Sequence, residues 1–406
     1  MSLFNKNRSL FLGARYIARL HQQKCSLSVL GIETSCDDTG VALVQSDGKV
    51  LGNITNSQQG IHLRYGGIIP PRAQDLHRLN IEDTYNKCIE SAGVDPSSLD
   101  AIAVTTRPGL VLSLMIGLRF AKYLGRKYSK PIIPIHHMEA HALAVRMEQS
   151  VEFPYLCLLI SGGHSQLVFI KKATEFYLLG ESLDDAPGEA FDKISRRLRL
   201  NTMTKYANLN GGQAIETAAK EATSPDRFEF PLPLCRYKDC NFSFAGLKNN
   251  AIRAITATEL KEKTRPDDVI IEYKDFCAGF LKATTRHITN RTQRALEFCL
   301  RKMFFDNNLK PTIVVSGGVA NNDYIFDNIC NLAKKYDGRV FRPSKQYCSD
   351  NGAMIAWNGL EKLMEDKSYA LTNFDNLDVK GKCSLGFSLI DEVANEDIKC
   401  KWVKTL

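Results

Sequence analysis

The sequence lacks several features that would place it in a familiar class. It has no run of about 18 uncharged apolar residues, the length that a transmembrane helix needs, so we expect no membrane span. Its twelve cysteines include no CxxC pair, and their spread indicates reduced thiols inside a cell rather than a disulfide framework or a zinc ribbon. Neither the P-loop pattern nor the Rossmann glycine pattern is present, so neither of these nucleotide sites is supported.

Acidic side chains are also missing before Glu33. This stretch carries five of the eight net positive charges and leaves +3 for the rest, its basic residues being Lys6, Arg8, Arg15, Arg19 and Lys24. Arginine and serine mixed with apolar residues are typical of a mitochondrial transit peptide, which we predict over residues 1–28. The alternative is a basic tail that touches nucleic acid. Because the remaining body is close to neutral, local basic patches must hold any polyanionic partner.

The chain is long enough to bury a substantial core. With 406 residues and a 44% hydrophobic composition, it is expected to fold as two α/β domains. Apolar strands are predicted at 28–32, 39–45, 49–57, 101–105, 155–161, 166–170, 176–181 and 312–315. Helices are predicted from the loop 60–72 towards residue 91, and at 113–127, 188–199, 213–222 and 275–307.

The second half repeats the arrangement of the first, with a hairpin, a polar turn and then helices. This pattern indicates a duplicated α/β fold with mixed sheets around a cleft. We predict an N-terminal lobe over 29–150, a C-terminal lobe over 151–366 and a surface tail over 367–406.

Two histidines follow a short apolar strand in the segment 136–141, HHMEAH. His137 and His141 are four residues apart, so on a helix both imidazoles can reach one cation from the same side. Asp350, at the start of an apolar helix, is a candidate third ligand, since two histidines and a carboxylate leave positions open for substrate. The alternatives are ordinary ones: the histidines can be core or junction groups, and aspartate is a preferred N-cap.

Four polar or glycine-rich turns stand out, at residues 33–38, 161–165, 210–212 and 316–322. Adjacent glycines let the backbone approach a ligand and turn its N–H groups towards a phosphate. A hairpin turn or a helix cap explains each turn singly. Four turns in one chain favour a nucleotide.

Seven short segments together resemble one family. They are residues 31–40, 136–141, 161–164, 188–193, 243–248, 317–322 and 350–353, with the sequences GIETSCDDTG, HHMEAH, SGGH, GEAFDK, SFAGLK, GGVANN and DNGA. In this order they look like the Kae/TsaD (Gcp) family, the universal tRNA threonylcarbamoyladenosine transferases, and the resemblance runs from about residue 29 to 366. The leader suggests the mitochondrial branch.

The resemblance implies a fold, a reaction and partners. The fold would be of the actin/Hsp70/sugar-kinase type, with two ribonuclease-H-like lobes facing a nucleotide cleft. The reaction would move the threonylcarbamoyl group of threonylcarbamoyl-AMP to the exocyclic amine of the adenosine 3′ of the anticodon in mitochondrial tRNAs reading ANN codons, releasing AMP. It also implies one divalent metal per subunit (zinc, iron or magnesium), a threonylcarbamoyl-AMP synthase as functional partner, and, as our expectation, a homodimer.

The same resemblance assigns residues to roles. The metal ligands would be His137, His141 and Asp350. The phosphate and acyl part would be held by Ser161, Gly162, Gly163 and His164, the ribose by Asp192, Gly212 and Glu216, and the adenosine by Gly317, Gly318 and Asn322. A carboxylate suits ribose because it accepts the hydrogen bonds that vicinal hydroxyls donate. The proton acceptor is not evident: Glu33, Asp37 and Asp38 are candidates, or solvated turn residues.

Two basic segments could bring tRNA to the cleft. The first is 193–199, with four positive charges, and the second is 119–127, with Arg119, Lys122, Arg126 and Lys127. Phosphate contacts from such segments give salt-sensitive affinity. Many charge runs are only solvated helix faces.

Three other functions compete with the transferase. A zincin protease needs glutamate directly after the first histidine, whereas Met138 stands there and Glu139 lies about 100° further round the helix. A phosphotransferase or ATPase could use the same cleft, because fold alone does not fix chemistry. The third is a non-enzymatic, nucleotide-sensing scaffold.

Overall fold

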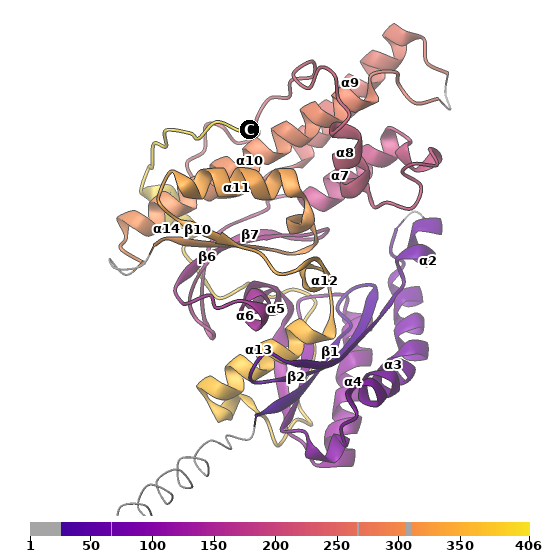
Figure 1. Ribbon diagram of the computed structural model, residues 1–406, viewed down its shortest axis with the longest axis vertical. Helices are drawn as coiled ribbons and strands as arrows, with labels where there is room; N and C mark the ends of the chain where they lie inside the picture. The colour runs from indigo at the N-terminus through magenta and orange to yellow at the C-terminus, as the bar shows by residue number, and fades with distance from the viewer. Residues whose placement is uncertain (1–25, 66, 266–267, 306–309) are drawn as a thin grey trace, which may run out of the picture.

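The computed structural model describes residues 26–65, 67–265, 268–305 and 310–406, so most of the predicted leader lies outside the described residues. Two α/β lobes stand one above the other in Figure 1. The predicted fold class is confirmed. No helix in the described ranges is long and apolar enough to cross a membrane.

The first lobe is built on a five-stranded sheet of order β3-β2-β1-β4-β5. Its strands are β1 (Ser28–Glu33), β2 (Asp38–Gln45), β3 (Val50–Ser57), β4 (Ala101–Arg107) and β5 (Ile132–His136). The first three form an antiparallel meander, and β4 and β5 continue the sheet in parallel to β1. The ranges 28–32, 39–45, 49–57 and 101–105, predicted as strands, coincide with β1 to β4 to within two residues at each end.

Side chains of this sheet alternate between two helical layers. Leu30 and Ile32 face α3 (Pro70–Ala92) and α4 (Val111–Tyr128), while Val29 faces α13 (Gly352–Glu365). A Cβ atom at Gly31 would meet the backbone of α13, so glycine lets this helix lie directly on the sheet. The start of α13, where Asp350 precedes it, is thereby fixed against the strands.

The second lobe contains a six-stranded sheet of order β10-β9-β6-β7-β8-β11. Its strands are β6 (Tyr155–Ile160), β7 (Ser165–Lys172), β8 (Glu175–Glu181), β9 (Thr312–Ser316), β10 (Arg339–Phe341) and β11 (Phe387–Ser388). One face packs against a helical layer made of α7 (Pro187–Arg197), α8 (Gly211–Ala219), α9 (Ala245–Glu262), α10 (Tyr273–Arg301) and α11 (Asp323–Lys334). Most of these helices were predicted, but α9 was not, although its buried residues Leu247, Ala251, Ile255 and Thr258 follow a helical period.

The other face of the second sheet closes on the helix that carries the two histidines. Residues of β6 such as Tyr155 and Cys157 share a core with Met138 and Leu143 of α5 (His137–Leu143). Tyr155 also donates a hydrogen bond to the carbonyl of Ala142 at 3.0 Å. The helix therefore lies between the lobes, as Figure 1 shows.

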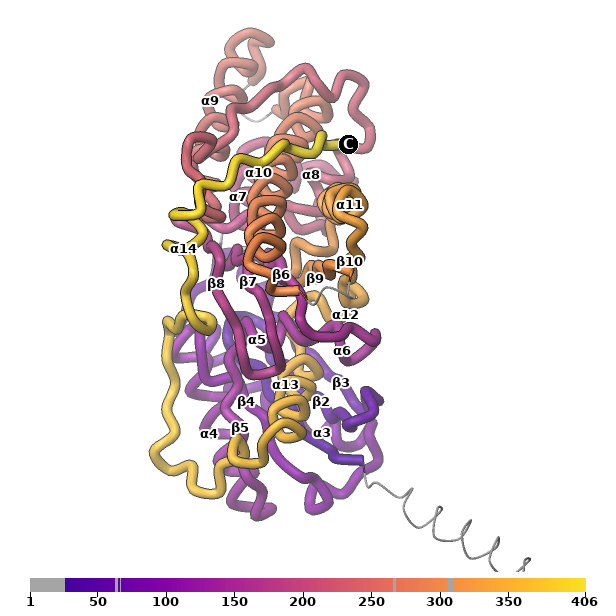
Figure 2. Tube along the Cα trace, turned by 90° about the vertical axis from the view of Figure 1, so that its left-hand side faces the viewer, coloured from indigo at the N-terminus to yellow at the C-terminus, as the bar shows by residue number. Residues whose placement is uncertain are grey.

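The order of the chain does not fully match the spatial layers. Helix α13 comes from the second half of the sequence yet packs on the first sheet. The tail after it bridges Leu371 to Ile132 in the first lobe, adds β11 to the second sheet, and then runs past α14 (Ile390–Asn395) (Figure 2). The boundaries at residues 150 and 366 stay predictions. One loop expectation was wrong in part, because the segment 60–72 contains α2 (Gln59–Arg64) and the start of α3.

Candidate metal centre

The histidine pair is placed by a strand that passes into a helix without a loop. β5 ends at His136 and α5 begins at His137. The Nδ1 atom of His136 accepts a hydrogen bond from the Met138 N–H at 3.2 Å, which leaves Nε2 to donate to the carbonyl of Cys383 at 3.3 Å. His136 is thus used as the N-cap, and burial lowers its pKa to about 4. The next two histidines point elsewhere.

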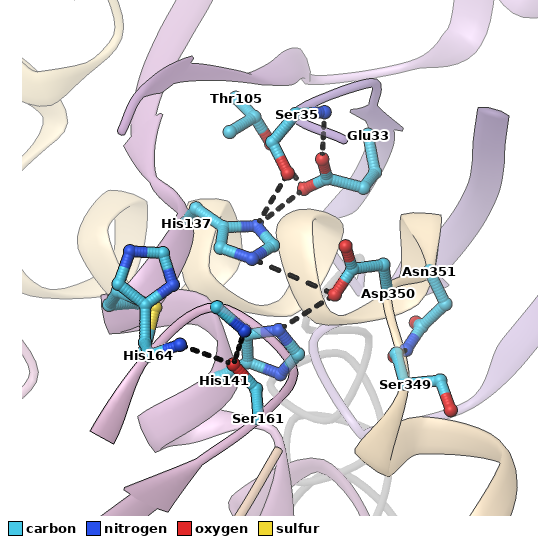
Figure 3. A network of polar contacts seen from close by, with 12 residues as sticks. Glu33, Ser35, Thr105, His137, His141, Ser161, His164, Ser349, Asp350 and Asn351 are labelled. Carbon is cyan, nitrogen blue, oxygen red and sulfur yellow. Dashed lines mark hydrogen bonds and ion pairs between the residues drawn. The ribbon is translucent and has the colours of Figure 1, made fainter. Parts of the chain in front are cut away.

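His137 and His141 converge with Asp350 (Figure 3). Both histidines are buried, and their rings lie one helical turn apart with centroids separated by 4.6 Å. The Oδ1 atom of Asp350 lies 3.0 Å from Nε2 of His141 and 3.6 Å from Nε2 of His137. One ligand atom from each of the three residues falls within 4.8 Å of the others, which is the clustering that a single divalent ion requires.

Asp350 is not the N-cap of the helix that follows it. That position belongs to Asn351, whose Oδ1 accepts the Met354 N–H at 3.0 Å. The carboxylate of Asp350 is therefore left to face the histidines. Burial alone would raise its pKa, but His137 and His141 outweigh burial and the pKa of Asp350 is lowered.

Glu33 lies on the opposite side of His137 and has no exposed surface. Its Oε2 is 3.1 Å from Nδ1 of His137 and also accepts a 2.7 Å hydrogen bond from the hydroxyl of Thr105. A carboxylate bonded to Nδ1 holds a proton there and turns Nε2 towards Asp350, so the neutral ring, once Nε2 has lost its proton, presents the Nε2 lone pair to a metal. This is the tautomer in which His137 can bind a metal.

The charges favour a cation at this point. Burial would lower the pKa of His137, yet Asp350 and Glu33 on either side raise it to about 9. The protein therefore surrounds the ring with groups that stabilise positive charge. Two imidazole nitrogens and one carboxylate oxygen suit zinc, iron and similar divalent ions, so the residues present fit a metal.

The positions of the side chains, like the sequence, do not match a zincin protease. Glu139, the nearest acidic residue on α5, has its carboxylate 2.7 Å from the ammonium of Lys362 on α13. It is therefore committed to an ion pair and does not serve as a base on a metal-bound water.

The other two acidic candidates lie on the turn into β2. Asp38 is partly buried, and burial, opposed by a hydrogen bond from Ser57, raises its pKa to about 7. No hydrogen-bond partner of its Oδ1 atom is found among the described residues. Asp37 is partly exposed, and its backbone carbonyl accepts the Gln58 N–H at 3.0 Å.

The turn between β6 and β7 lies beside the histidines (Figure 3). The hydroxyl of Ser161 accepts hydrogen bonds from the N–H groups of Gly163 and His164, at 3.3 and 3.0 Å. Gly162 and Gly163 are exposed, with open space where a side chain would be. Burial, with His137 and His141 nearby, lowers the pKa of His164 to about 4. A neutral imidazole and an open glycine turn thus adjoin the metal ligands.

The remaining turns are linked to this one by direct contacts. The Gly188 N–H at the start of α7 donates to the carbonyl of Ser161 at 3.2 Å. Further along α7, Asp192 accepts the Gly211 N–H at 2.9 Å, beside Gly212 in the first turn of α8. Glu216 is buried and accepts the Asp323 N–H at 3.0 Å, so one of its oxygens is used at the start of α11.

Gly317, Gly318 and Asn322 are the residues that the family resemblance assigns to the adenosine. Gly317 has φ +97°, and a Cβ atom there would collide with the carbonyl of Ile160, so only glycine fits. Gly318 next to it has open space around it. Asn322 caps α11 through Oδ1, which accepts the Ile325 N–H at 3.0 Å, while its buried Nδ2 has no partner among the described residues. Such an unpartnered donor is costly unless a ligand satisfies it.

Comparisons with known proteins identify a family for the chain. A family model described as "TsaD: tRNA N6-adenosine threonylcarbamoyltransferase" matches residues 49–357. A Drosophila melanogaster protein named "Probable tRNA N6-adenosine threonylcarbamoyltransferase, mitochondrial" is 56% identical over 384 residues, which cover 93% of each chain. A Mus musculus protein named "tRNA N6-adenosine threonylcarbamoyltransferase, mitochondrial" is 43% identical over 385 residues, 94% of this chain and 91% of its own.

A solved structure supports the fold. The crystal structure of T. kodakarensis HypF superposes with a TM-score of 0.53 and 14% identity, covering 86% of this chain and 49% of that chain. At 14% identity the similarity supports only the fold, and it confirms the expected actin/Hsp70/sugar-kinase type.

Proposed function

Because the chain belongs to the TsaD family of tRNA N6-adenosine threonylcarbamoyltransferases, we propose that its interlobe site uses threonylcarbamoyl-AMP as donor and a divalent metal as Lewis acid. The protein is a tRNA-modifying transferase of the mitochondrial branch. The acceptor we propose is the adenosine 3′ of the anticodon in mitochondrial tRNAs that read ANN codons. The single observation that carries the proposal is the convergence of His137, His141 and Asp350 beside the open turn 161–164.

The metal would be held by Nε2 of His137, Nε2 of His141 and Oδ1 of Asp350. When bound, it would polarise the acyl phosphate and neutralise charge as AMP departs. Glu33 is assigned a positioning role, since its carboxylate holds the proton on Nδ1 of His137. Its complete burial behind this ring makes it a poor proton acceptor for a tRNA base.

The donor would lie across the linked turns. The exposed turn at Gly162 and Gly163 leaves open space for the phosphate beside the Gly162 N–H, while the Gly163 N–H donates to the hydroxyl of Ser161. The neutral His164 can hydrogen-bond to the acyl part. Asp192, with Gly212 nearby, would accept hydrogen bonds from the ribose hydroxyls. The unpartnered Nδ2 of Asn322, beside Gly317 and Gly318, would donate to the adenine. Glu216 would act through the start of α11 that it holds.

The proton acceptor we propose is Asp38. The exocyclic amine attacks the carbamoyl carbon, the bond from that carbon to the phosphate oxygen breaks, and AMP leaves with the electron pair. The amine proton passes to Asp38, whose pKa of about 7 is close to that of an efficient base at neutral pH.

Incorporation of labelled threonine tests the function. The full chain would be incubated with unmodified tRNA, a threonylcarbamoyl-AMP synthase, ATP, bicarbonate and a divalent metal. We expect label in the tRNA, and loss of that label with His141→Ala. Transfer of the γ-phosphate of ATP to a small acceptor, without label in tRNA, would instead indicate the phosphotransferase. The synthase as functional partner and the homodimer remain part of the proposal.

A further inference from the structure

A second concave surface lies at the far end of α7 from the glycine turns. It is a hollow of about 430 Å³ between the C-terminal end of α7 and that of α9. Its lining includes Arg196, Arg197, Arg199 and Arg265, together with Thr256 and Glu259. Four guanidinium groups facing one small volume repel each other unless an anion is bound between them.

Only part of this charge is neutralised within the protein. Glu259 is the one carboxylate among the described residues of the lining, and Arg197 binds it with both terminal nitrogens at 2.6 Å. Arg199 contacts the backbone carbonyl of Asp268 at 3.4 Å, which leaves its charge in place. Arg196 and Arg265 are exposed and form no ion pair with any residue that the structure describes. Among the described residues of the lining, four arginines and one glutamate leave an excess of three positive charges.

Helix α7 connects this hollow to the donor site. Its first turn contacts Ser161 through Gly188, its middle carries Asp192, and its last residues are Arg196 and Arg197. At about 1.5 Å per residue, the two ends are separated by about 13 Å. A strand of RNA with one adenosine in the cleft can place a phosphate at this distance within a few nucleotides.

We propose that this arginine-lined hollow binds the ribose-phosphate backbone of the tRNA substrate. The inference rests on the proposed function, because the tRNA bound here is the acceptor for the transfer in the interlobe site. Guanidinium groups bind phosphate oxygens bidentately, and such contacts position the RNA without reading its sequence. The basic segment 193–199 thus acts through Arg196 and Arg199, while Arg197 orders the wall of the hollow through Glu259.

The test is the salt dependence of tRNA binding by an Arg196→Gln/Arg265→Gln variant of the full chain. Neither side chain has an ion pair to lose among the described residues, so the variant should fold normally. Each lost phosphate contact removes roughly 0.7 to 0.9 from the slope of log Kd against log salt concentration. We expect the slope to fall by about 1.5 and Kd for unmodified tRNA to rise roughly tenfold at low salt. An Arg301→Gln/Arg339→Gln variant, with the same change in charge at the end of α10 and on β10, is the control and should leave both values unchanged.

Two further readouts separate this inference from the proposed function. AMP affinity and the transfer rate at saturating tRNA should be the same in a single Arg265→Gln variant and the unaltered chain, because the charge of Arg196 also acts on Asp192, where it opposes the rise in pKa that burial causes. If the unaltered chain transfers the threonylcarbamoyl group but the Arg196→Gln/Arg265→Gln variant keeps the original Kd and slope, the proposed role of the hollow is wrong and the proposed function is not affected. A lower AMP affinity in Arg265→Gln also overturns the proposed role of the hollow, because the effect would then arise in the cleft. Failure of the unaltered chain to modify tRNA would be a failure of the proposed function, whatever the hollow binds.

Discussion

The carboxylate of Glu33 lies 3.1 Å from Nδ1 of His137, across 104 residues of sequence. It joins β1 to the first turn of α5, and the hydroxyl of Thr105 on β4 donates a hydrogen bond to the same carboxylate oxygen. The ring is therefore oriented before any ligand arrives. Preorganisation of this kind lowers the cost of placing a metal ligand.

Replacing this carboxylate should weaken metal binding without removing a ligand. In Glu33→Gln the side chain keeps its size but loses the charge that fixes the proton on Nδ1 of His137. We expect metal affinity to fall about 10- to 100-fold, measured by calorimetric titration of the metal-free chain. Glu82→Gln, on an exposed part of α3, should bind metal as the unaltered chain does. Equal affinity in Glu33→Gln would mean that His137 is oriented by other contacts.

Asp38 should set the acidic limb of the pH-rate profile. A base must be deprotonated to act, so with a pKa of about 7 the transfer rate should be half-maximal near pH 7 and level off at higher pH. Asp38→Asn should lower the rate about 100-fold or more and remove that limb, as single-turnover assays between pH 5.5 and 8.5 would show. Asp37→Asn should keep the limb. A limb near pH 7 that persists in Asp38→Asn would identify another proton acceptor.

Asn322 allows its two hydrogen-bonding roles to be separated. Asn322→Asp retains an oxygen for the Ile325 N–H, and aspartate is as good an N-cap as asparagine, but the Nδ2 donor is lost. We expect the thermal midpoint to stay within about 2 °C and Kd for AMP to rise roughly 3- to 10-fold, since one hydrogen bond contributes about 0.5–1.5 kcal/mol. Unchanged AMP affinity would show that Nδ2 does not contact the nucleotide.

Gly317 and Gly318 form a matched pair for a stability test. An alanine at position 317 must adopt φ +97° and place its methyl group against the carbonyl of Ile160. Gly317→Ala should therefore lower the free energy of unfolding by roughly 2 kcal/mol or more in a urea titration. Gly318→Ala meets open space and should lower it by less than about 1 kcal/mol. Equal losses in the two variants would contradict the backbone placement of this turn.

Local patterns were sufficient for much of the fold. Strands such as β1 and β6 are short apolar runs, and the spacing of His137 and His141 predicted their shared face because one helical turn brings such residues together. The packing of α13 on the first sheet was not predictable, since it depends on Gly31, which contacts a helix more than 300 residues later. That contact also positions Asp350.

The roles of individual acidic residues required the structure. Asp350 was readable either as a ligand or as an N-cap, and the choice is made by Asn351, which caps the helix itself. Glu33, Asp37 and Asp38 lie within six residues of sequence and looked alike there. Their side chains differ in burial and partners, which only the folded neighbours His137, Thr105 and Ser57 determine. The arginine-lined hollow at the end of α7 was likewise not predictable from the segment 193–199, because Arg265, which follows α9, supplies part of its lining.

A comparison of Asp350→Asn with Asp366→Asn tests the metal centre most directly. These two aspartates stand at opposite ends of α13, and Asp366 caps the turn after it. Bound metal and labelled threonine in tRNA would be measured on the same preparations of each variant. We predict that Asp350→Asn loses both while Asp366→Asn keeps both. An Asp350→Asn variant that retains its metal and modifies tRNA at the original rate would contradict the metal centre formed by His137, His141 and Asp350.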